Sequence, residues 1–238
     1  MGKKYCLAGI IISGVLVFSL ALAQETGIFL REDFNSLENW EPMNFPKIKR
    51  HTLYTIVQEG ESSYLKAESN ASASGIVFKR EFNVFDYPKI RWRWKISNVF
   101  EKGDVKVKAG DDYPARIYIL FTYDPRTASF GQKIKYGLFR KLYGEYPPHS
   151  TLNYIWANRK HEETVFVSTY ADESMIIPLE SGAENAGMWV EEDVKIVDDY
   201  QKVFGVDPPS TASLAIMNDS DNTGESAVSY IDYIEIYR

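Results

Sequence analysis

Residues 218–224, which read NDSDNTG, form the segment whose residue types best match a known chemistry. Alternating oxygen ligands on a tight turn that contains glycine suit a hard cation such as calcium. The sequence therefore predicts a possible structural calcium at Asp219, Asp221 and Asn222. The match to a helix-flanked calcium loop fails at Tyr230, where a bidentate glutamate would stand. A polar β-turn capped by its own side chains is the alternative interpretation.

A second group of charged residues stands at the start of an expected strand. Asp111 and Asp112 precede Arg116. Adjacent carboxylates with separated pKa values can serve as general acid and base, or they can hold a ligand. Neighbouring residues on a strand point to opposite faces, so at most one of the two acids meets a ligand together with Arg116. We predict that Asp112 and Arg116 contact the ligand. A structural Asp–Arg pair is the alternative.

The third candidate is the run LNYIWAN at residues 152–158. Flat aromatic rings beside amide groups suit sugars, whose C–H faces stack on the ring while the amide bonds hydroxyls. Asn153 and Trp156 are therefore predicted ligand contacts. Core packing is the alternative, and it is the expectation for Trp92 and Trp94, which share one face of their strand.

The sequence contains no evident catalytic nucleophile. The histidines are His51, His149 and His161; no nucleophile elbow accompanies them, and none of them has a metal-binding spacing. A glycoside hydrolase or lyase that uses Asp111 or Asp112 with Arg116 stays open, because catalytic carboxylates can come from distant parts of a chain. Whether the protein is an enzyme is therefore uncertain, and a non-catalytic binding module is favoured.

Short alternating runs bounded by turn residues must position these groups. In IRWRWKI, at residues 90–96, apolar and basic residues alternate strictly, which predicts a half-buried strand. The other predicted strands are residues 52–58, 64–68, 75–82, 116–123, 152–156, 164–170, 175–179, 213–217 and 229–237. Many short strands without strand–helix alternation predict an all-β fold, an antiparallel β-sandwich of jelly-roll type with one or two short helices in connections.

Two segments have helical patterns. Residues 198–204 begin with acids and end before Gly205. Residues 129–143 form a basic amphipathic insertion that contains Lys133, Lys135, Arg140 and Lys141. A solvated helix packed on the sandwich is the favoured interpretation of this insertion. Contact with an anionic membrane surface or with another envelope protein is the alternative.

Composition and the first residues indicate where the protein works. The chain has 238 residues, a formal net charge of −6 and one cysteine, which fits one globular domain and disfavours nucleic acid as a partner. Residues 1–23 resemble a secretory signal, with Lys3 and Lys4 before an apolar run and ALA before Gln24. Cleavage leaves residues 24–238 as a single β-sandwich domain with 25 basic and 33 acidic residues, a formal −8, and no cysteine. A periplasmic or extracellular location is expected, with membrane attachment only through an uncleaved signal.

Several of these segments, taken in order, resemble the bacterial domain-of-unknown-function family 3047. They are RWRWK at 91–95, GDD at 110–112, ARIY at 115–118, LNYIWA at 152–157, SG at 181–182, Trp189, DDY at 198–200, FG at 204–205 and DSDNTG at 219–224. The resemblance covers the chain from about Phe29 onward. It implies an exported β-sandwich with a distant likeness to carbohydrate-binding jelly rolls, and it implies no established activity. Residues 124–150 are an elaboration on the family pattern.

The sequence thus favours an exported, non-catalytic binding module of the bacterial cell envelope whose ligand is a glycan or another envelope component. An envelope polysaccharide-acting enzyme is one alternative. A structural envelope protein that binds another protein through the basic insertion is the other.

Overall fold

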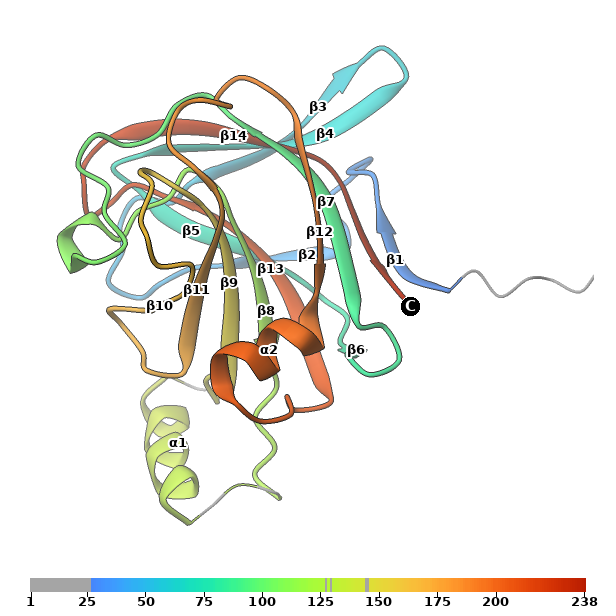
Figure 1. The fold of residues 1–238 in the computed structure, drawn as a ribbon, viewed down its shortest axis with the longest axis vertical. Coiled ribbons are helices and arrows are strands. Elements are labelled where there is room, and N and C mark those ends of the chain that lie inside the picture. Colours follow the sequence, from blue (N-terminus) through green and yellow to red (C-terminus); the bar gives the residue numbers. More distant parts are fainter. Residues whose placement is uncertain (1–26, 127, 129, 144–145) are drawn as a thin grey trace, which may run out of the picture.

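Two β-sheets packed face to face form the body of the protein in the computed structural model (Figure 1). The structure describes residues 27–238 except 127, 129, 144 and 145. The predicted signal at residues 1–23 lies outside the described residues. The all-β sandwich expected from the sequence is confirmed.

Sheet A has the strand order β12-β7-β14-β4-β3, and β1 also pairs with the long strand β14. Its strands are β1 (Ile28–Glu32), β3 (Leu53–Glu59), β4 (Ser62–Asn70), β7 (Lys89–Ile96), β12 (Val190–Lys195) and β14 (Ser226–Tyr237). The residues of β7 are alternately half-buried and buried, as its sequence predicts. Trp92 and Trp94 point into the core and are fully buried.

Sheet B has the order β10-β11-β9-β8-β13-β5-β2, and β6 pairs with β13. Its strands are β2 (Trp40–Met43), β5 (Ala73–Phe78), β6 (Phe82–Asn83), β8 (Arg116–Phe121), β9 (Ser150–Ala157), β10 (Phe166–Val167), β11 (Ser174–Ser181) and β13 (Thr211–Asp219). The inner faces of both sheets share one large apolar cluster, which includes Trp92, Ile117 and Trp156.

Each of the ten predicted strands coincides with a strand of the structure, and the predicted strand at 75–82 is divided into β5 and the start of β6. Three strands lack a sequence prediction: β1, β2 and β12, which are short or lie at sheet edges and carry few apolar alternations. The strand β12 reads VEEDVK, and its exposed acids Glu191 and Asp193 stand opposite Arg93 and Arg91 of β7. The pairing of β9 with β11 is parallel, whereas the other pairings of the described strands are antiparallel.

Both predicted α-helices are present, and a short 3-10 turn accompanies them. The helix α1 (Phe130–Tyr143) projects beyond one end of the sandwich, and α2 (Ile196–Phe204) covers that end next to β12 (Figure 1). The turn η1 (Lys108–Gly110) lies in the connection from β7 to β8. Across residues 27–238, the helices that are described are too short or too polar to cross a membrane.

Candidate functional site

The outer face of sheet B carries a cavity of about 510 Å³. Arg116 and Tyr118 alternate along β8 with the core residues Ile117 and Ile119, so their side chains point away from the core toward this cavity. Polar and charged residues of the lining are Lys47, Asp111, Arg116, Thr151, Ser168, Ser174, Asp219, Asp221 and Asn222; apolar and aromatic ones are Phe45, Pro46, Ile48, Ala73, Tyr118, Tyr170, Ala171 and Met217.

Arg116 organises the floor of the cavity. Its Nε donates to Oδ1 of Asp219 at 2.7 Å, and its Nη2 donates to Oδ2 of the same carboxylate. Nη2 also donates to the backbone oxygen of Asp111 at 2.7 Å, and Nη1 donates to the hydroxyl of Tyr118 at 3.1 Å. The guanidinium carbon lies 4.2 Å from the ring centroid of Tyr113. This two-pronged contact with a carboxylate fixes the orientation of both side chains.

The Arg116–Asp219 pair is almost completely removed from water, with both residues at most 5% exposed. Burial lowers the pKa of Arg116, but the negative charge of Asp219, together with the contributions of Tyr118, Asp111 and Tyr113, more than offsets this, and the net pKa lies well above the ordinary value. Burial raises the pKa of Asp219, and the guanidinium acts against that rise. Because each charge compensates the other, the pair holds strands β8 and β13 together at the floor.

Asp112 anchors the predicted calcium loop. Its Oδ2 accepts the backbone N–H of Thr223 at 2.6 Å, and its Oδ1 accepts that of Asn222 at 3.3 Å. Gly224 ends the turn with a positive φ of 74°, which favours glycine. Asp112 is fully buried and is absent from the cavity lining, so the structure assigns it a structural contact instead of the predicted ligand contact.

The connection between β7 and β8 is tied to sheet B by Asn158. Its Oδ1 accepts the N–H of Phe100 at 2.8 Å, and its Nδ2 donates to the backbone oxygen of Asp112 at 2.6 Å. A Cβ on Gly103 would lie 2.0 Å from that Nδ2, so only glycine admits this close approach. The connection thereby holds Asp111 and Asp112 beside β13.

Asp221 and Asn222 form part of the wall. The pKa of Asp221 is raised, first by burial and then by the charge of Asp112. Asn222 donates to the hydroxyl of Tyr170 at 2.8 Å and to the backbone oxygen of Lys108 at 3.1 Å. These bonds join the 219–224 loop to the β10–β11 turn and to η1.

The structure brings together most, but not all, of the predicted site residues. Arg116, Asp219, Asp221 and Asn222 line one cavity. Trp156 does not, because its ring is fully buried between the sheets, 5.8 Å from that of Trp94, and its Nε1 donates to the oxygen of Gly182. The prediction that Trp156 contacts a ligand is therefore wrong for this structure, and the core alternative describes it.

Asn153 lies on the outer face of sheet B, paired with Tyr118, but it is only 1% exposed and does not line the cavity. Its Oδ1 is buried, and within the described part of the chain no hydrogen-bond partner reaches it. The predicted contact between Asn153 and a ligand is therefore not available in this structure, since neighbouring chain segments cover the amide.

Sequence reasoning missed two walls of the cavity. Phe45, Pro46 and Ile48 come from the connection between β2 and β3, which has no periodic pattern. Tyr170 comes from the turn after β10. Tyr118 could have been found, because it stands two residues after Arg116 on a strand and must share its face.

Asp112, Asp219 and Asp221 each place one carboxylate oxygen within 4.8 Å of the others. Such a cluster has the donor type that calcium prefers. The oxygens of Asp219 already face Arg116, and those of Asp112 face backbone N–H groups. Two of the three carboxylates thus already have positively polarised partners, and calcium binding stays a prediction.

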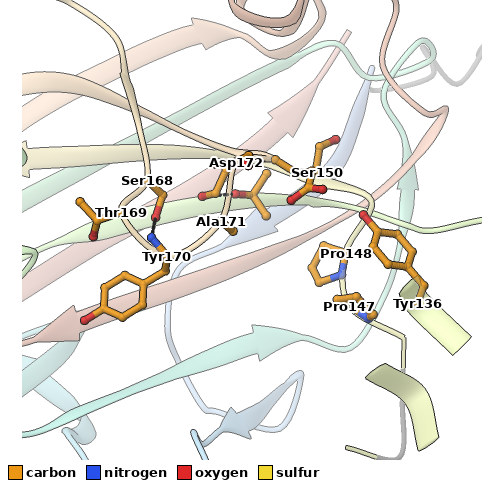
Figure 2. A pocket seen from close by; sticks show the side chains of 12 residues that line it. Tyr136, Pro147, Pro148, Ser150, Ser168, Thr169, Tyr170, Ala171 and Asp172 are labelled. Carbon is orange, nitrogen blue, oxygen red and sulfur yellow. Dashed lines mark hydrogen bonds between the residues drawn. The ribbon is translucent and has the colours of Figure 1, made fainter. Parts of the chain in front are cut away.

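A second cavity, of about 430 Å³, adjoins the first. Tyr136, Pro147 and Pro148 lie on one side of it, and the β10–β11 turn lies on the other (Figure 2). The two cavities share five lining residues: Thr151, Ser168, Tyr170, Ala171 and Ser174.

The fold and this site define a β-sandwich protein with a hollowed outer sheet face. The chain belongs to the family described as "Protein of unknown function (DUF3047)", which matches residues 38–235. The resemblance seen in the sequence is therefore confirmed. None of the curated proteins matches the sequence.

Solved structures with a similar arrangement include three proteins at low identity. The family 11 carbohydrate-binding module of the cellulase Lic26A-Cel5E of Clostridium thermocellum has a TM-score of 0.44 and 10% identity, over 89% of this chain and 95% of that one. Endoglucanase 3 of Trichoderma harzianum, from family GH12, has a TM-score of 0.39 and 8% identity, over 85% and 100%. The winged bean acidic lectin complexed with methyl-α-D-galactose has a TM-score of 0.38 and 9% identity, over 87% and 96%.

Proposed function

We propose that the protein is an exported carbohydrate-binding module and that its ligand occupies the cavity on the outer face of sheet B. The observation that carries this proposal is the pairing of a rigid polar floor, built on Arg116 and Asp219, with aromatic and apolar walls. A sugar offers hydroxyls to such a floor and C–H faces to such walls. Tyr118 and Tyr170 supply the rings, and Asp221 and Asn222 supply polar groups.

The charge of the cavity selects the class of sugar. Among the described residues of the lining there are three carboxylates, Asp111, Asp219 and Asp221, against the two cations Lys47 and Arg116. Arg116 is already engaged by Asp219. An anionic ligand would meet net repulsion in a site of reduced dielectric. The proposed ligand is therefore a neutral glycan and not a uronic-acid or sulfated one.

Export belongs to the proposal and rests on the first 23 residues. Their lysines, apolar run and small residues before Gln24 have the order of a cleaved secretory signal. A neutral glycan of the bacterial envelope or its surroundings is then within reach of the cavity. Fractionation of cells that express the whole chain, with sequencing of the mature terminus, tests this element, and a mature protein that begins at Met1 would contradict it.

Purified residues 24–238 should bind neutral glycans on an array and leave acidic glycans unbound. For the glycan retained most strongly, Tyr170→Ala should weaken binding about two- to tenfold, as expected for loss of one aromatic contact. Tyr237→Ala, on the outer face of sheet A, is the matched control and should leave binding unchanged. Equal losses in both variants, or preference for acidic glycans, would overturn the proposal.

A glycan-cleaving enzyme is the second candidate, favoured by one observation. Asp111 and Asp221 come from different segments and face the same cavity, and Oδ1 of Asp111 is buried without a hydrogen-bond partner in the described residues. Most glycosidases use a pair of carboxyl groups that face the same cavity. This candidate predicts reducing-end release from the bound glycan and its loss in Asp221→Asn with binding retained. Binding of the glycan without release of product would exclude the enzyme and support the binding module.

A further inference from the structure

We infer that the ligand is a glycan chain that lies across the β10–β11 turn and fills both cavities, so that the second cavity is a further binding subsite. This inference rests on the proposed function, because it takes the first cavity as a sugar site. It adds a requirement for ligand length and a second set of contact residues. This second set does not include the site residues that were predicted from the sequence.

The turn between the cavities is a fixed ridge. The N–H of Ser168 donates to the oxygen of Ser174 at 2.8 Å, and the N–H of Ser174 donates to that of Ala171 at 3.1 Å. The hydroxyl of Thr151 donates to that of Ser174 at 2.7 Å, which ties the turn to β9. Because these bonds close the turn on itself and on sheet B, its two sides keep a constant relation to each other.

Tyr170 stands at the point that both cavities share. Its hydroxyl accepts a hydrogen bond from Asn222 at 2.8 Å, and Nζ of Lys108 lies 4.5 Å from its ring centroid. These contacts hold the side chain in place, yet it is 57% exposed. An exposed ring fixed between two hollows is well placed to stack on the sugar that joins their occupants.

The second cavity repeats the chemistry of the first. Tyr136, Pro147 and Pro148 give it a flat apolar side, and the turn side presents the hydroxyl residues Ser168 and Thr169 (Figure 2). Ser174 also lines this cavity. Its charged lining residues, within the described chain, are the acids Asp172 and Glu173. Both cavities are thus suited to neutral sugars and unsuited to anionic ones.

Each cavity has the size of a small-molecule site, at about 510 and 430 Å³. Two sites of that size, with like chemistry and a common wall, suit consecutive units of one polymer better than two unrelated ligands. Affinity should therefore rise with chain length until both cavities are filled, because the second set of contacts forms without a new loss of translational freedom.

Calorimetric titration of residues 24–238 with cello-, laminari- and chito-oligosaccharides of two to six units tests the inference. For the series that binds, the hexasaccharide should bind at least tenfold more tightly than the disaccharide. The double variant Pro148→Ala/Asp172→Asn, at two exposed positions of the second cavity, should lose most of that gain and keep the disaccharide affinity. Asp198→Asn, an exposed acid on α2, is the matched control and should keep the gain.

The outcomes separate the inference from the proposed function. If disaccharide and hexasaccharide bind equally, or if the double variant retains the full gain with length, the second subsite is refuted while sugar binding stands. If no saccharide on the array or in these series binds, the proposed function fails and the inference fails with it. Asp172→Trp, which fills the second cavity from its exposed turn, gives an independent check: it should abolish the gain with length, and an unchanged gain would overturn the inference.

Discussion

The outer faces of the two sheets use the same residue types in opposite ways. On sheet A, Arg31 lies over the ring of Tyr233 at 4.1 Å, and Nζ of Lys95 lies 4.6 Å from the rings of both Trp189 and Tyr230. On sheet B, a single arginine, Arg116, contacts a tyrosine ring and a carboxylate inside a cavity floor.

Exposure separates the two faces. The side chain of Arg93 is 43% exposed, and it reaches Asp232, which is 27% exposed, and the ring of Trp189 just before β12. Arg91 is 40% exposed, and it reaches the ring of Tyr237 and the carboxylate of Glu235, which is only 6% exposed. The side chain of Arg116 is 5% exposed. Exposed pairs can exchange partners with water and contribute little, whereas a buried charge depends entirely on its partner. The exposed Arg93–Asp232 pair on sheet A is therefore dispensable, whereas the outer face of sheet B is organised around one buried pair, Arg116–Asp219.

The largest expected effect is the loss of the buried pair. Arg116→Ala leaves Asp219 buried without its main partner, and we expect the free energy of unfolding to fall by about 3–5 kcal/mol. Arg93→Ala, which breaks an exposed pair with Asp232, should cost less than about 1 kcal/mol. Urea unfolding measures both, and equal losses would remove the distinction between the two faces.

Asp112→Asn should have the next largest effect. The amide that replaces the carboxylate can accept only one of the two N–H groups, from Asn222 and Thr223, that Asp112 now accepts. We expect a loss of about 1.5–3 kcal/mol in the free energy of unfolding. Asp232→Asn on sheet A is the control and should change stability by less than about 1 kcal/mol. An unchanged free energy of unfolding in Asp112→Asn would show that water replaces the lost hydrogen bond of the Asp112 carboxylate.

Two adjacent residues of β12 repeat the contrast between exposed and buried charge, and they predict a pH effect. Glu191 is exposed and accepts the hydroxyl of Tyr233, whereas Glu192, paired with Trp92, points inward. Burial, together with the charge of Glu180, raises the pKa of Glu192 from 4.5 to about 7. The native state therefore keeps a proton that the unfolded chain releases, and stability falls as pH rises from about 4.5 to about 7.

Glu192→Gln should remove that part of the pH dependence. Because Glu192 is partly exposed, we expect a gain of about 1–2 kcal/mol at pH 8, or about 2–4 °C in Tm for each kcal/mol. At pH 4 the variant and the parent should melt together. Glu191→Gln, its exposed neighbour, should leave the slope of Tm against pH unchanged. Thermal melts from pH 4 to pH 8 test this prediction. If Glu192→Gln keeps the parent's slope of Tm against pH, other titratable groups cause that slope.

The smallest expected effect is that of chelation. Arg116 and the backbone N–H groups already engage the oxygens of Asp219 and Asp112. Calcium or chelator should therefore shift the Tm of residues 24–238 by less than about 1 °C. A melting point lowered by chelator, restored by calcium and insensitive in Asp221→Ala would instead establish the cation site at the 219–224 loop, since a ligand of the native state raises its stability.

The periodic parts of the fold could be predicted from the sequence. Strict alternation in β7 placed Trp92 and Trp94 in the core, and turn residues separated ten strands. The acidic edge strand β12 was missed because its pattern depends on the cations of β7 beside it, not on its own residues. The parallel pairing of β9 with β11 was missed for a related reason, since neither strand alone carries information about the direction of its neighbour.

The candidate site shows the same division. Arg116, Asp219, Asp221 and Asn222 were identified as chemically notable, and they share a cavity. Trp156 was assigned to the ligand because both faces of its strand carry apolar side chains, Tyr154 and Trp156 on one and Ile155 and Ala157 on the other, so alternation left the buried side undecided. The sequence did not indicate that Phe45 and Ile48 line the cavity. They lie in an irregular connection, and only the path of the folded chain brings that connection to sheet B.

The sequence by itself determined an all-β chain and the set of polar segments from which a site is made, because side-chain alternation and turn chemistry are local properties. Only the tertiary structure decided that Arg116 meets Asp219, about a hundred residues away, that Asp112 anchors a loop, and that Trp156 is buried. These outcomes depend on which strands become neighbours and which face is covered. That choice is made by burial of the whole apolar surface and not by any segment alone.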